Sequence, residues 1–452
     1  MSAHTFFAVP EAPAYALRHV RIPACLTTPT AQALTVATTF EHGDLHDADL
    51  MIEDGCIAAI LPAGTAAPAS GPDLRQSMVL PGLLDCHTHL DKGHIWPRKP
   101  NPTGDGAGAA QATGEDRTAR WREHDLLARM SFGLQTAYAH GVLAIRTHLD
   151  CLQPQADISF PVFQELREAW QGRIDLQASS IAPLDIFLTD EGRRLADTVA
   201  RAGGQLGCVT RFRGLPNVPL QPEFDVAIRR FFELAAERGL DADLHVDETG
   251  DARVLSLAEV ARIATEVGFA GRILCGHCCS LALQDEARIA RTLDACARAG
   301  IDFVSLPTVN LYLQDRDPTA SRTPRWRGVT LLHEMKARGL RVAIAGDNCR
   351  DPFHAYGDHD MLDTYTQAVK ILHLDHPLGH WIEAATRTPA DIMGLPQRGR
   401  LAPGLPADLL VLRARNYSEL LARHQSDRVV LRQGRAIDTR LPDYRLLDEL
   451  MT

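Results

Sequence analysis

Two histidines separated by one residue, His87 and His89, carry the clearest chemical signal in the sequence. They end an extended, mostly apolar run over residues 78–86, which predicts a β-strand. Side chains at positions i and i+2 of a strand point the same way, so both imidazoles can reach one divalent ion at about 2.0–2.1 Å. One such pair among 19 histidines is more often a coincidence. The pair therefore predicts a metal site only together with further ligands downstream.

Three further residues of metal-binding type follow apolar, strand-like segments: His245, His277 and Asp347. Taken singly, each has a structural explanation, because an isolated histidine usually satisfies hydrogen bonds and an isolated aspartate often caps the next helix. In α/β barrels, however, the carboxyl ends of the strands converge at the active site. The shared position of these residues therefore indicates one metal centre.

Glu248 lies three residues after His245, close enough to the metal to transfer protons without binding it. A divalent metal lowers the pKa of a bound water to about 7, which makes hydroxide accessible at neutral pH. A site of this kind needs three or four protein ligands and a position for water. Together these residues predict hydrolytic chemistry.

The elements that must position these residues follow from the rhythm of the sequence. Up to about residue 80 the chain reads as short strands and turns, with strands over 33–40 and 48–60 and a turn over 41–44. Strand-like runs then alternate with segments of helical spacing until about residue 394. In this region we expect strands over 143–148, 174–177, 242–246, 272–275, 302–305 and 341–345. Helices are expected near 161–169, 254–267, 284–299 and 329–338.

Repeated strand–helix units predict a parallel sheet, and their number favours a closed barrel over an open sheet. The predicted fold class is α/β, a (β/α)8 TIM-type barrel with a small β-sandwich domain formed from both termini. We place the catalytic barrel at residues 81–394 and the β-sandwich at residues 1–80 plus 395–452. The segment 92–123 is rich in proline, glycine and charge, so we expect a long loop over the barrel mouth.

Composition excludes several functional classes. The chain has 452 residues and a net charge of −10, whereas nucleic-acid-binding proteins need clustered Lys and Arg. It has no signal-like N-terminus and no run near the roughly 18 apolar residues of a membrane span. Ten irregularly spaced cysteines indicate buried thiols rather than a disulfide framework. Cys275 and Cys278 form one Cys-x-x-Cys pair, but no second pair completes a zinc site. We expect a cytoplasmic protein with neither a nucleic-acid nor a membrane partner.

The segments around these residues resemble the amidohydrolase superfamily, and more narrowly the bacterial cytosine deaminase-like family, over nearly the whole chain. The matching segments are His-Thr-His-Leu-Asp-Lys at 87–92, Arg-Thr-His-Leu-Asp at 146–150, His-Val-Asp-Glu at 245–248, Gly-His at 276–277, Val-Asn-Leu-Tyr-Leu-Gln at 309–314, Gly-Asp at 346–347 and the stretch 399–409. The resemblance implies one catalytic ion, Zn²⁺ or Fe²⁺, with four ligands: His87, His89, His245 and Asp347. It also implies catalytic roles for Glu248 in proton relay, for His277 in orienting the attacking water or the tetrahedral centre, and for Asp347.

The number of metal ions can be tested on the sequence. Two-metal members of this superfamily typically bridge their ions with a carboxylated lysine at the end of the fourth strand. This chain has no lysine between Lys99 and Lys336, and the corresponding run at 208–213 reads Cys-Val-Thr-Arg-Phe-Arg. A one-metal site is favoured, and in this superfamily it accompanies deamination more often than ring opening.

Departures from cytosine deaminase indicate a different substrate. The glutamine that follows the third strand in that enzyme is replaced by Ile-Ala-Pro-Leu-Asp at 181–185, and Asn348 and Phe353 stand for an aspartate and a tryptophan. A site built to bond a polar edge rejects analogues strongly, so changed residues imply a changed substrate. The candidate substrate-binding residues are Leu184, Asp185, Asn348, Phe353, Arg211 and Arg213.

Several residues near the mouth have more than one interpretation. Arg211 and Arg213 could hold a carbonyl or carboxylate group, but they could equally be solvated or paired within the protein. Lys92 borders the same mouth without an assigned contact, as does His94. At the second strand, His148 and Asp150 are expected to orient the metal ligands without binding the metal themselves.

Three functional interpretations stay open. In the first, a metal-dependent hydrolytic deaminase releases ammonia from a small amino-substituted nitrogen heterocycle, cytosine-like but not cytosine itself. In the second, the same one-metal site hydrolyses an N-substituted amine or a cyclic amide such as a triazine- or hydantoin-like ring. The third is a barrel that only binds its ligand, and the complete set of catalytic residue types argues against it. We favour the first, with the small heterocyclic substrate as the partner. A homo-oligomer stays open, because relatives commonly assemble but the sequence shows no interface signature.

Overall fold

The computed structural model of the chain divides into two compact units. The described residues are 6–28, 34–38, 45–215, 219–317, 319, 322–376, 380–424 and 428–452. The first unit comprises Met1–Leu84, Gln135–Leu143 and Asp360–Leu441. The second comprises Asp85–Leu134, Ala144–His359 and Pro442–Thr452. The domain boundaries expected from the sequence, 80/81 and 394/395, stay a prediction.

The first unit contains two antiparallel sheets. One has β3 (Leu45–Glu53) between β1 (Ala14–Pro23) and β2 (Thr35–Thr38), with β4 (Cys56–Pro62) also paired to β3. The other has the order β16-β15-β14-β5, in which the C-terminal strand β14 (Leu409–Val411) pairs with β5 (Val79–Pro81). The remaining two strands of this sheet are β15 (Val429–Arg432) and β16 (Arg435–Ala436).

Apolar side chains from both sheets pack into one core, which includes Leu17, Leu50, Val79, Leu409 and Leu431. The predicted β-domain built from both ends of the chain is therefore confirmed.

One of the N-terminal strand predictions needs a correction. The strand predicted over 48–60 is a hairpin of β3 and β4, because Asp54 and Gly55 both adopt positive φ angles, 48° and 81°. Asp-Gly is a strong two-residue hairpin signal, and here it outweighs the continuous apolar pattern of the segment. The strand predicted over 33–40 is β2 (Thr35–Thr38) in the described part, and the turn predicted over 41–44 lies outside the described residues.

The second unit carries the succession of strands and helices that the sequence predicts. Its strands lie in a three-stranded sheet with the order β6-β7-β8 and a five-stranded parallel sheet with the order β13-β12-β11-β10-β9. The strands are β6 (Leu83–Thr88), β7 (Val142–Asp150), β8 (Asp175–Ile181), β9 (Leu206–Val209), β10 (Ala242–Val246), β11 (Ile273–His277), β12 (Ile301–Ser305) and β13 (Val342–Ile344).

Parallel bridges join the two sheets at both edges. Ser179 pairs with Gln205 between β8 and the start of β9, and Thr88 of β6 pairs with Asp347 just beyond β13. At the second junction the backbone N–H of Asp347 donates to the carbonyl of His87 at 2.9 Å. The strands thus follow one another from β6 to β13 and the first meets the last, which is the (β/α)8 arrangement. The predicted fold class is confirmed.

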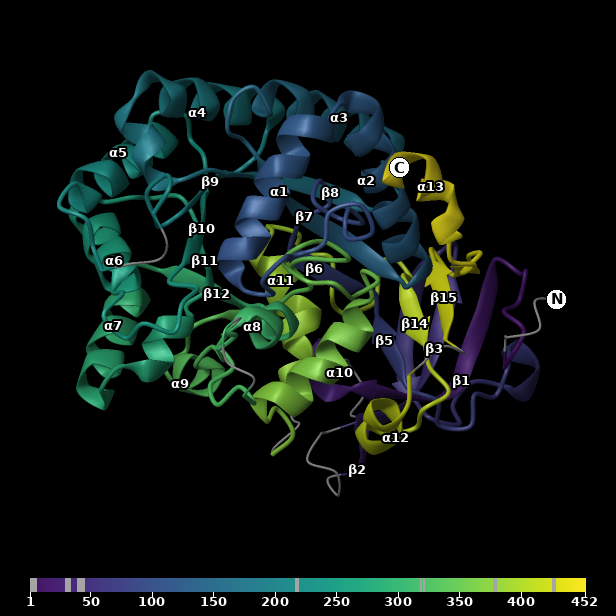
Figure 1. Cartoon of the computed structure of the whole chain (residues 1–452). Helices are drawn as coiled ribbons and strands as arrows, with labels where there is room; N and C mark the ends of the chain where they lie inside the picture. Colours follow the sequence, from purple (N-terminus) through teal and green to yellow (C-terminus); the bar gives the residue numbers. More distant parts are fainter. Residues whose placement is uncertain are drawn as a thin grey trace. The chain divides into compact units, whose positions relative to one another are not determined.

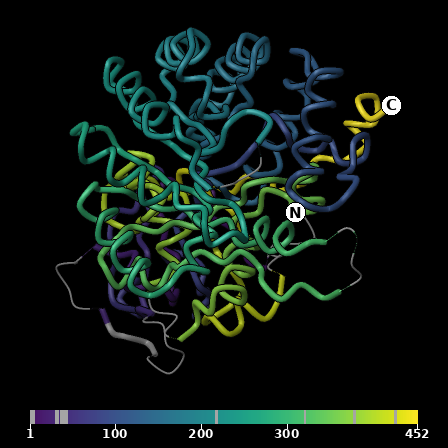
Figure 2. The backbone as a smooth tube through the Cα atoms, turned by 60° about the vertical axis from the view of Figure 1, so that its left-hand side comes forward, coloured from purple at the N-terminus to yellow at the C-terminus, as the bar shows by residue number. Residues whose placement is uncertain are grey.

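Helices follow the strands of this unit. They are α3 (Ala156–Ala169), α4 (Asp190–Ala202), α5 (Phe224–Ala236), α6 (Ser256–Glu266), α7 (Glu286–Arg298), α8 (Pro307–Leu313) and α9 (Leu332–Ala337). Figure 1 shows α4 to α7 along the outer side of β9 to β12, and Figure 2 traces the same succession from blue through teal to green. The helices predicted near 161–169, 254–267, 284–299 and 329–338 correspond to α3, α6, α7 and α9.

Local sequence explains these helices. In α7 the Asp285 carboxylate caps the first turn by accepting the backbone N–H of Arg288 at 2.9 Å. Ile289, Leu293 and Cys296 then recur at helical spacing and are buried. This one-sided pattern packs the helix against its strand.

The predicted long loop over 92–123 was wrong in part, because it contains helix α1 (Gly106–Arg120), which is followed by α2 (Glu123–Ala139). Asp105 caps α1 by accepting the backbone N–H of Gly108 at 2.8 Å, and Ala109 and Ala112 face inward. The Asp105 cap and the alanines, which have the highest helix propensity, outweigh the glycines and prolines of this segment.

Two further observations concern the chain as a whole. All ten cysteines are free thiols, and eight of them are buried. Within the described residues, no helix combines the length and the apolar composition that crossing a membrane requires.

Candidate metal centre and active site

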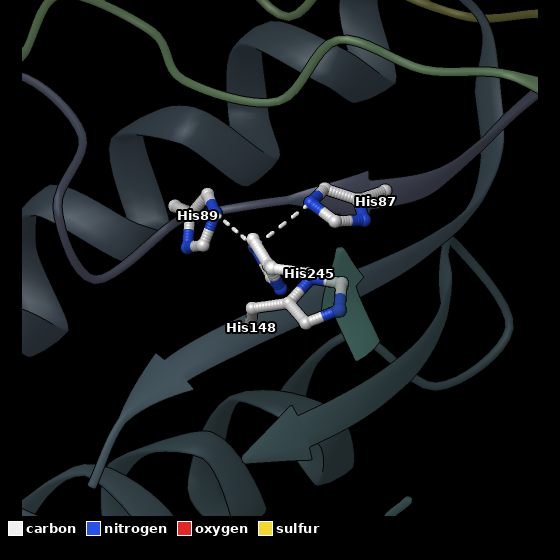
Figure 3. Close-up of side chains that lie close together, drawn as sticks. All are labelled: His87, His89, His148 and His245. Atoms are coloured by element: carbon white, nitrogen blue, oxygen red, sulfur yellow. Dashed lines mark hydrogen bonds between the residues drawn. The ribbon is translucent and has the colours of Figure 1, made fainter. Parts of the chain in front are cut away.

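Four predicted ligands converge at the carboxyl ends of the barrel strands. The Nε2 atom of His245 lies 3.1 Å from Nε2 of His87 and 3.3 Å from Nε2 of His89. Oδ1 of Asp347 lies 3.2 Å from Nε2 of His89 and 3.7 Å from Nε2 of His87. Figure 3 shows the rings of His87 and His89 turned toward the ring of His245. All four side chains are buried.

These distances fit a metal ion better than they fit hydrogen bonds. Four ligands at about 2.0–2.1 Å from a tetrahedral ion lie roughly 3.3–3.4 Å from one another, and the observed distances of 3.1–3.7 Å bracket this value. Burial, followed by neighbouring histidines and Lys92, lowers the pKa of His87 and His89 well below the usual range. The lone pairs of neutral rings that face one another repel, and a cation bound between them removes this repulsion.

Asp347 supplies the negative charge of the group. Its two carboxylate oxygens have no hydrogen-bond partner among the described residues. Burial first, and then the Glu248 and Asp351 carboxylates, raise the pKa of Asp347 well above its usual value. A divalent cation would provide the missing counter-charge, so the donor set fits one bound metal.

His148 belongs to the same group of buried donors. Its ring centre lies 4.0 Å from that of His87 and 4.8 Å from that of His245. His148 was expected to lie outside the ligand shell, whereas one of its ring nitrogens lies close to the donor atoms of the other three histidines. Its Nε2 atom lies 3.1 Å from Oδ1 of Asp243, which orients the ring.

Two buried aspartates that sequence analysis did not single out hold the ligand strands in place. Asp243 also pairs with Arg146 at 3.1 Å. Asp85 accepts the backbone N–H groups of His87 at 3.3 Å and Gly346 at 3.2 Å, and burial raises its pKa to about 7. Each aspartate stands two residues before a ligand histidine on the same strand face, and this spacing could have revealed them.

Glu248 and His277 are joined by Asn310 of α8. The Asn310 side-chain amide donates to Oε1 of Glu248 at 3.2 Å and lies 3.0 Å from Nδ1 of His277. With the amide nitrogen of Asn310 facing it, Nδ1 of His277 is placed to accept a hydrogen bond, and the tautomer that fits this contact carries its proton on Nε2. Nε2 of His277 has no hydrogen-bond partner among the described residues, and His277 lines the cavity. Asn310 belongs to the motif at 309–314, but the sequence does not predict its role.

The neighbouring acid, Asp247, has a different task. Its carboxylate accepts the backbone N–H groups of Ser256 at 3.2 Å and Leu257 at 3.0 Å, at the start of α6. Asp247 also adopts a left-handed backbone, with φ of 49°. Of the two acids in Asp247-Glu248, only Glu248 lines the cavity.

Gly276 allows β11 to approach the metal ligands. A Cβ at this position would lie 3.0 Å from Cε1 of His87. This close approach explains why the Gly-His pair at 276–277 has no larger residue before its histidine.

A cavity of about 910 Å³ opens above the metal ligands. Its lining includes His89, Glu248 and Asp347, together with four of the predicted substrate-binding residues: Arg211, Arg213, Asn348 and Phe353. Leu184 and Asp185 are not part of this lining. Leu184 is fully buried, and the Asp185 carboxylate accepts the backbone N–H of Arg213 at 2.6 Å.

The predicted binding residues differ in how they are held. The Arg213 guanidinium pairs with Glu191 at 2.8 Å, and its side chain is half exposed. The Asn348 amide donates to Asp351 at 2.7 Å. The ring of Phe353 lies 5.4 Å from Nζ of Lys92.

A buried charge cluster forms one wall of the cavity. Asp150 pairs with Lys92 at 3.1 Å and with Arg117 of α1 at 2.7 Å. Burial opposes the charge on Lys92, but the Asp150 and Asp91 carboxylates outweigh it and raise the pKa of Lys92. Lys92 thus stays charged beside His89, whose Nδ1 atom is 3.1 Å away. The segment 92–123, which was expected to be a loop, therefore contributes Arg117 of α1 to the cavity.

Comparison with known proteins agrees with this geometry. A profile of the amidohydrolase family matches residues 182–437. A pterin deaminase of Rhizobium rhizogenes (strain K84) is 49% identical over 455 residues, covering 99% of each chain. The chain belongs to the amidohydrolase family. The predicted family is confirmed, and so is the predicted class of enzyme, a hydrolytic deaminase acting on carbon–nitrogen bonds other than peptide bonds.

More distant amidohydrolase relatives extend the comparison. An N-isopropylammelide isopropyl amidohydrolase of Pseudomonas sp. (strain ADP) is 24% identical, covering 81% of this chain and 87% of that protein. Among solved structures, a 5-methylcytosine deaminase from Klebsiella pneumoniae superposes with a TM-score of 0.77 at 23% identity. The superposition covers 95% of this chain and 98% of that one. It supports the barrel fold described above.

Proposed function

We propose that this amidohydrolase deaminates a pterin, replacing the exocyclic amino group of the bicyclic ring with oxygen and releasing ammonia. The observation that carries the proposal is the 49% identity to a pterin deaminase over 99% of both chains. This chain lacks the glutamine that follows the third strand in cytosine deaminase, and its cavity has a volume of about 910 Å³. Both features support a substrate larger than a single pyrimidine.

We further propose that four residues hold one Zn²⁺ or Fe²⁺ ion: His87, His89, His245 and Asp347. Imidazole and carboxylate ligands suit both metals. When bound, such an ion lowers the pKa of a water to about 7 and so supplies a nucleophile at neutral pH. His148, held by Asp243, keeps the neighbouring rings in place.

Glu248 is the residue that transfers protons in the proposed reaction. Its carboxylate lines the cavity with its side chain about one-fifth exposed, so it is accessible to both water and substrate. Glu248 takes a proton from the attacking water, delivers it to the ring nitrogen and then assists departure of the amino group as ammonia. Asp347 accepts a hydrogen bond from the same water.

His277 stabilises the tetrahedral centre. Nδ1 contacts Asn310, and Nε2 has no partner among the described residues; in our proposal Nε2 donates to the oxygen that forms on the attacked carbon. Asn310 therefore acts as a positioning residue for both the acid–base group and the electrophilic histidine.

We propose that residues of the cavity rim, Arg211, Asn348 and Phe353, contact the ring and its substituent, since all three line the cavity. Phe353 offers an aromatic edge, and Arg211 offers hydrogen bonds to a carbonyl or carboxylate. We also propose that the enzyme works in the cytoplasm, which free thiols at all ten cysteines support.

Hydrolysis of an N-substituted amine is the second candidate, supported by the 24% identity to the N-isopropylammelide enzyme. The two candidates release different products, ammonia and an alkylamine.

The test is a panel of pterin, cytosine, an N-alkylated aminotriazine and a hydantoin, with ammonia and product mass measured together. Deamination exchanges one NH for one oxygen, whereas ring opening adds a whole water. We expect ammonia and the deaminated mass from pterin. Alkylamine release from the triazine with no turnover of pterin would instead establish the second candidate.

A further inference from the structure

A second group of buried metal-binding side chains lies outside the active site. It consists of His94, Cys349 and His359, whose donor atoms all lie within 4.8 Å of one another. The three side chains are 1%, 3% and 8% exposed. The mechanism above uses none of them.

The ring of His94 carries the strongest indication of a ligand. Both of its nitrogens are buried without a hydrogen-bond partner among the described residues, although buried polar atoms are normally paired. Its nearest rings are those of Phe132 at 4.8 Å and His359 at 5.7 Å between centres. An apolar neighbour satisfies neither nitrogen, whereas a metal ion would take the lone pair of one.

The backbone brings the three donors together from two loops, with Cys349 and His359 both between β13 and α10 (Met361–Leu372). His94 follows β6, and its N–H donates to the carbonyl of Cys349 at 3.1 Å, beyond β13. His94 and His359 both adopt left-handed backbones, with φ of 68° and 51°, which non-glycine residues rarely do. On the side of α2, a Cβ at Gly133 would lie 3.0 Å from Nε2 of His359, so glycine leaves room for this ring.

Two imidazoles and a thiolate are a donor set that zinc accepts readily. We propose that His94, Cys349 and His359 form a second, structural metal site for Zn²⁺ or another thiolate-binding divalent ion. The ion links the loop after β6 to the loop after β13. Because these loops also carry Lys92 and Asn348 of the cavity, the site fixes the rim while the active centre performs the chemistry.

Cobalt substitution tests the proposal independently of catalysis. Thiolate-to-cobalt charge transfer absorbs in the near ultraviolet, and none of the active-centre ligands contains sulfur. Metal-free full-length protein is titrated with Co²⁺, and bound metal and absorption are measured for the wild type, Cys349→Ser and the control Cys296→Ser. Cys296 is a buried thiol of α7 that belongs to none of the metal-type groups found among the described residues.

We expect two equivalents of cobalt and a charge-transfer band in the wild type and in Cys296→Ser. Cys349→Ser should bind one equivalent and lose the band. His94→Asn should also lose the second equivalent, which gives a second variant if Cys349→Ser does not fold. A wild type that binds one equivalent without the band, or a band that persists in Cys349→Ser, would overturn the proposal.

Discussion

The floor and the rim of the cavity are built in different ways. The floor consists of the ligands His87, His89 and His245 at strand ends. Buried aspartates hold the backbone of His87 and the ring of the neighbouring His148. The rim consists of loop residues, of which Arg213 is half exposed and held by one ion pair. We expect the floor to determine the reaction and the rim to determine which heterocycle reacts.

Loss of a floor ligand should have the largest effect. Asp347→Ala removes one donor and the negative charge of the group, so activity should fall to the background rate and bound metal should decrease. Elemental analysis beside ammonia release checks this. As a control, Arg213→Ala changes an exposed rim residue and should keep its metal; full occupancy and full activity in Asp347→Ala would contradict the ligand assignment.

Loss of the acid–base group should lower turnover without changing metal binding. Glu248→Gln keeps the size and the Asn310 contact but cannot take a proton, so kcat should fall by about 10²–10⁴ with bound metal unchanged. Metal content and steady-state kinetics on the same preparation provide the measurement. Wild-type turnover in this variant would remove Glu248 from the mechanism.

Substitution of Asn310 shows whether this residue orients Glu248 and His277 or binds the substrate. Asn310→Ala removes the donor to Glu248 and His277, and a hydrogen bond to a charged group contributes about 1.5–3 kcal/mol. We expect kcat to fall by roughly ten- to a hundredfold while KM changes little. Asn310→Gln, which can restore a donor, is the matched variant. A change confined to KM would place Asn310 in substrate binding instead.

Rim substitutions should have the smallest effects, and these should appear in KM. Phe353→Ala removes an aromatic contact of about 1–3 kcal/mol, which corresponds to roughly a five- to hundredfold rise in KM, and kcat should hold. Arg213→Ala, with its guanidinium engaged by Glu191, should change KM less than Arg211→Ala. Equal effects of the two arginine variants would show that the Glu191 pair does not keep Arg213 from the substrate.

The floor could be predicted from the sequence because strand periodicity is a local pattern and because barrel topology brings the carboxyl ends of all strands together. A His-x-His pair at one strand end and single ligands at later ones are enough to locate it. Asp243 and Asp85 escaped notice because a buried acid does not differ in the sequence from a helix cap, although both follow the same i+2 rule.

The residues that surround the metal ligands could not be predicted to the same degree. Asn310 reaches Glu248 from α8, and Arg117 reaches Asp150 from α1, which lies in a segment predicted to be a loop. Leu184 follows the third barrel strand as expected, yet its side chain is fully buried away from the cavity lining. Such contacts depend on where loops and short helices pack, which tertiary structure decides and local patterns do not.

The central claim is that a metal-loaded floor deaminates a pterin. The most direct test is to restore metal to metal-free enzyme and follow ammonia release from pterin, with product mass as confirmation. The account predicts that Zn²⁺ or Fe²⁺ restores ammonia release and the deaminated mass in the wild type but not in Asp347→Ala. Ammonia release that does not depend on metal, or no turnover of pterin by fully loaded wild type, would contradict it.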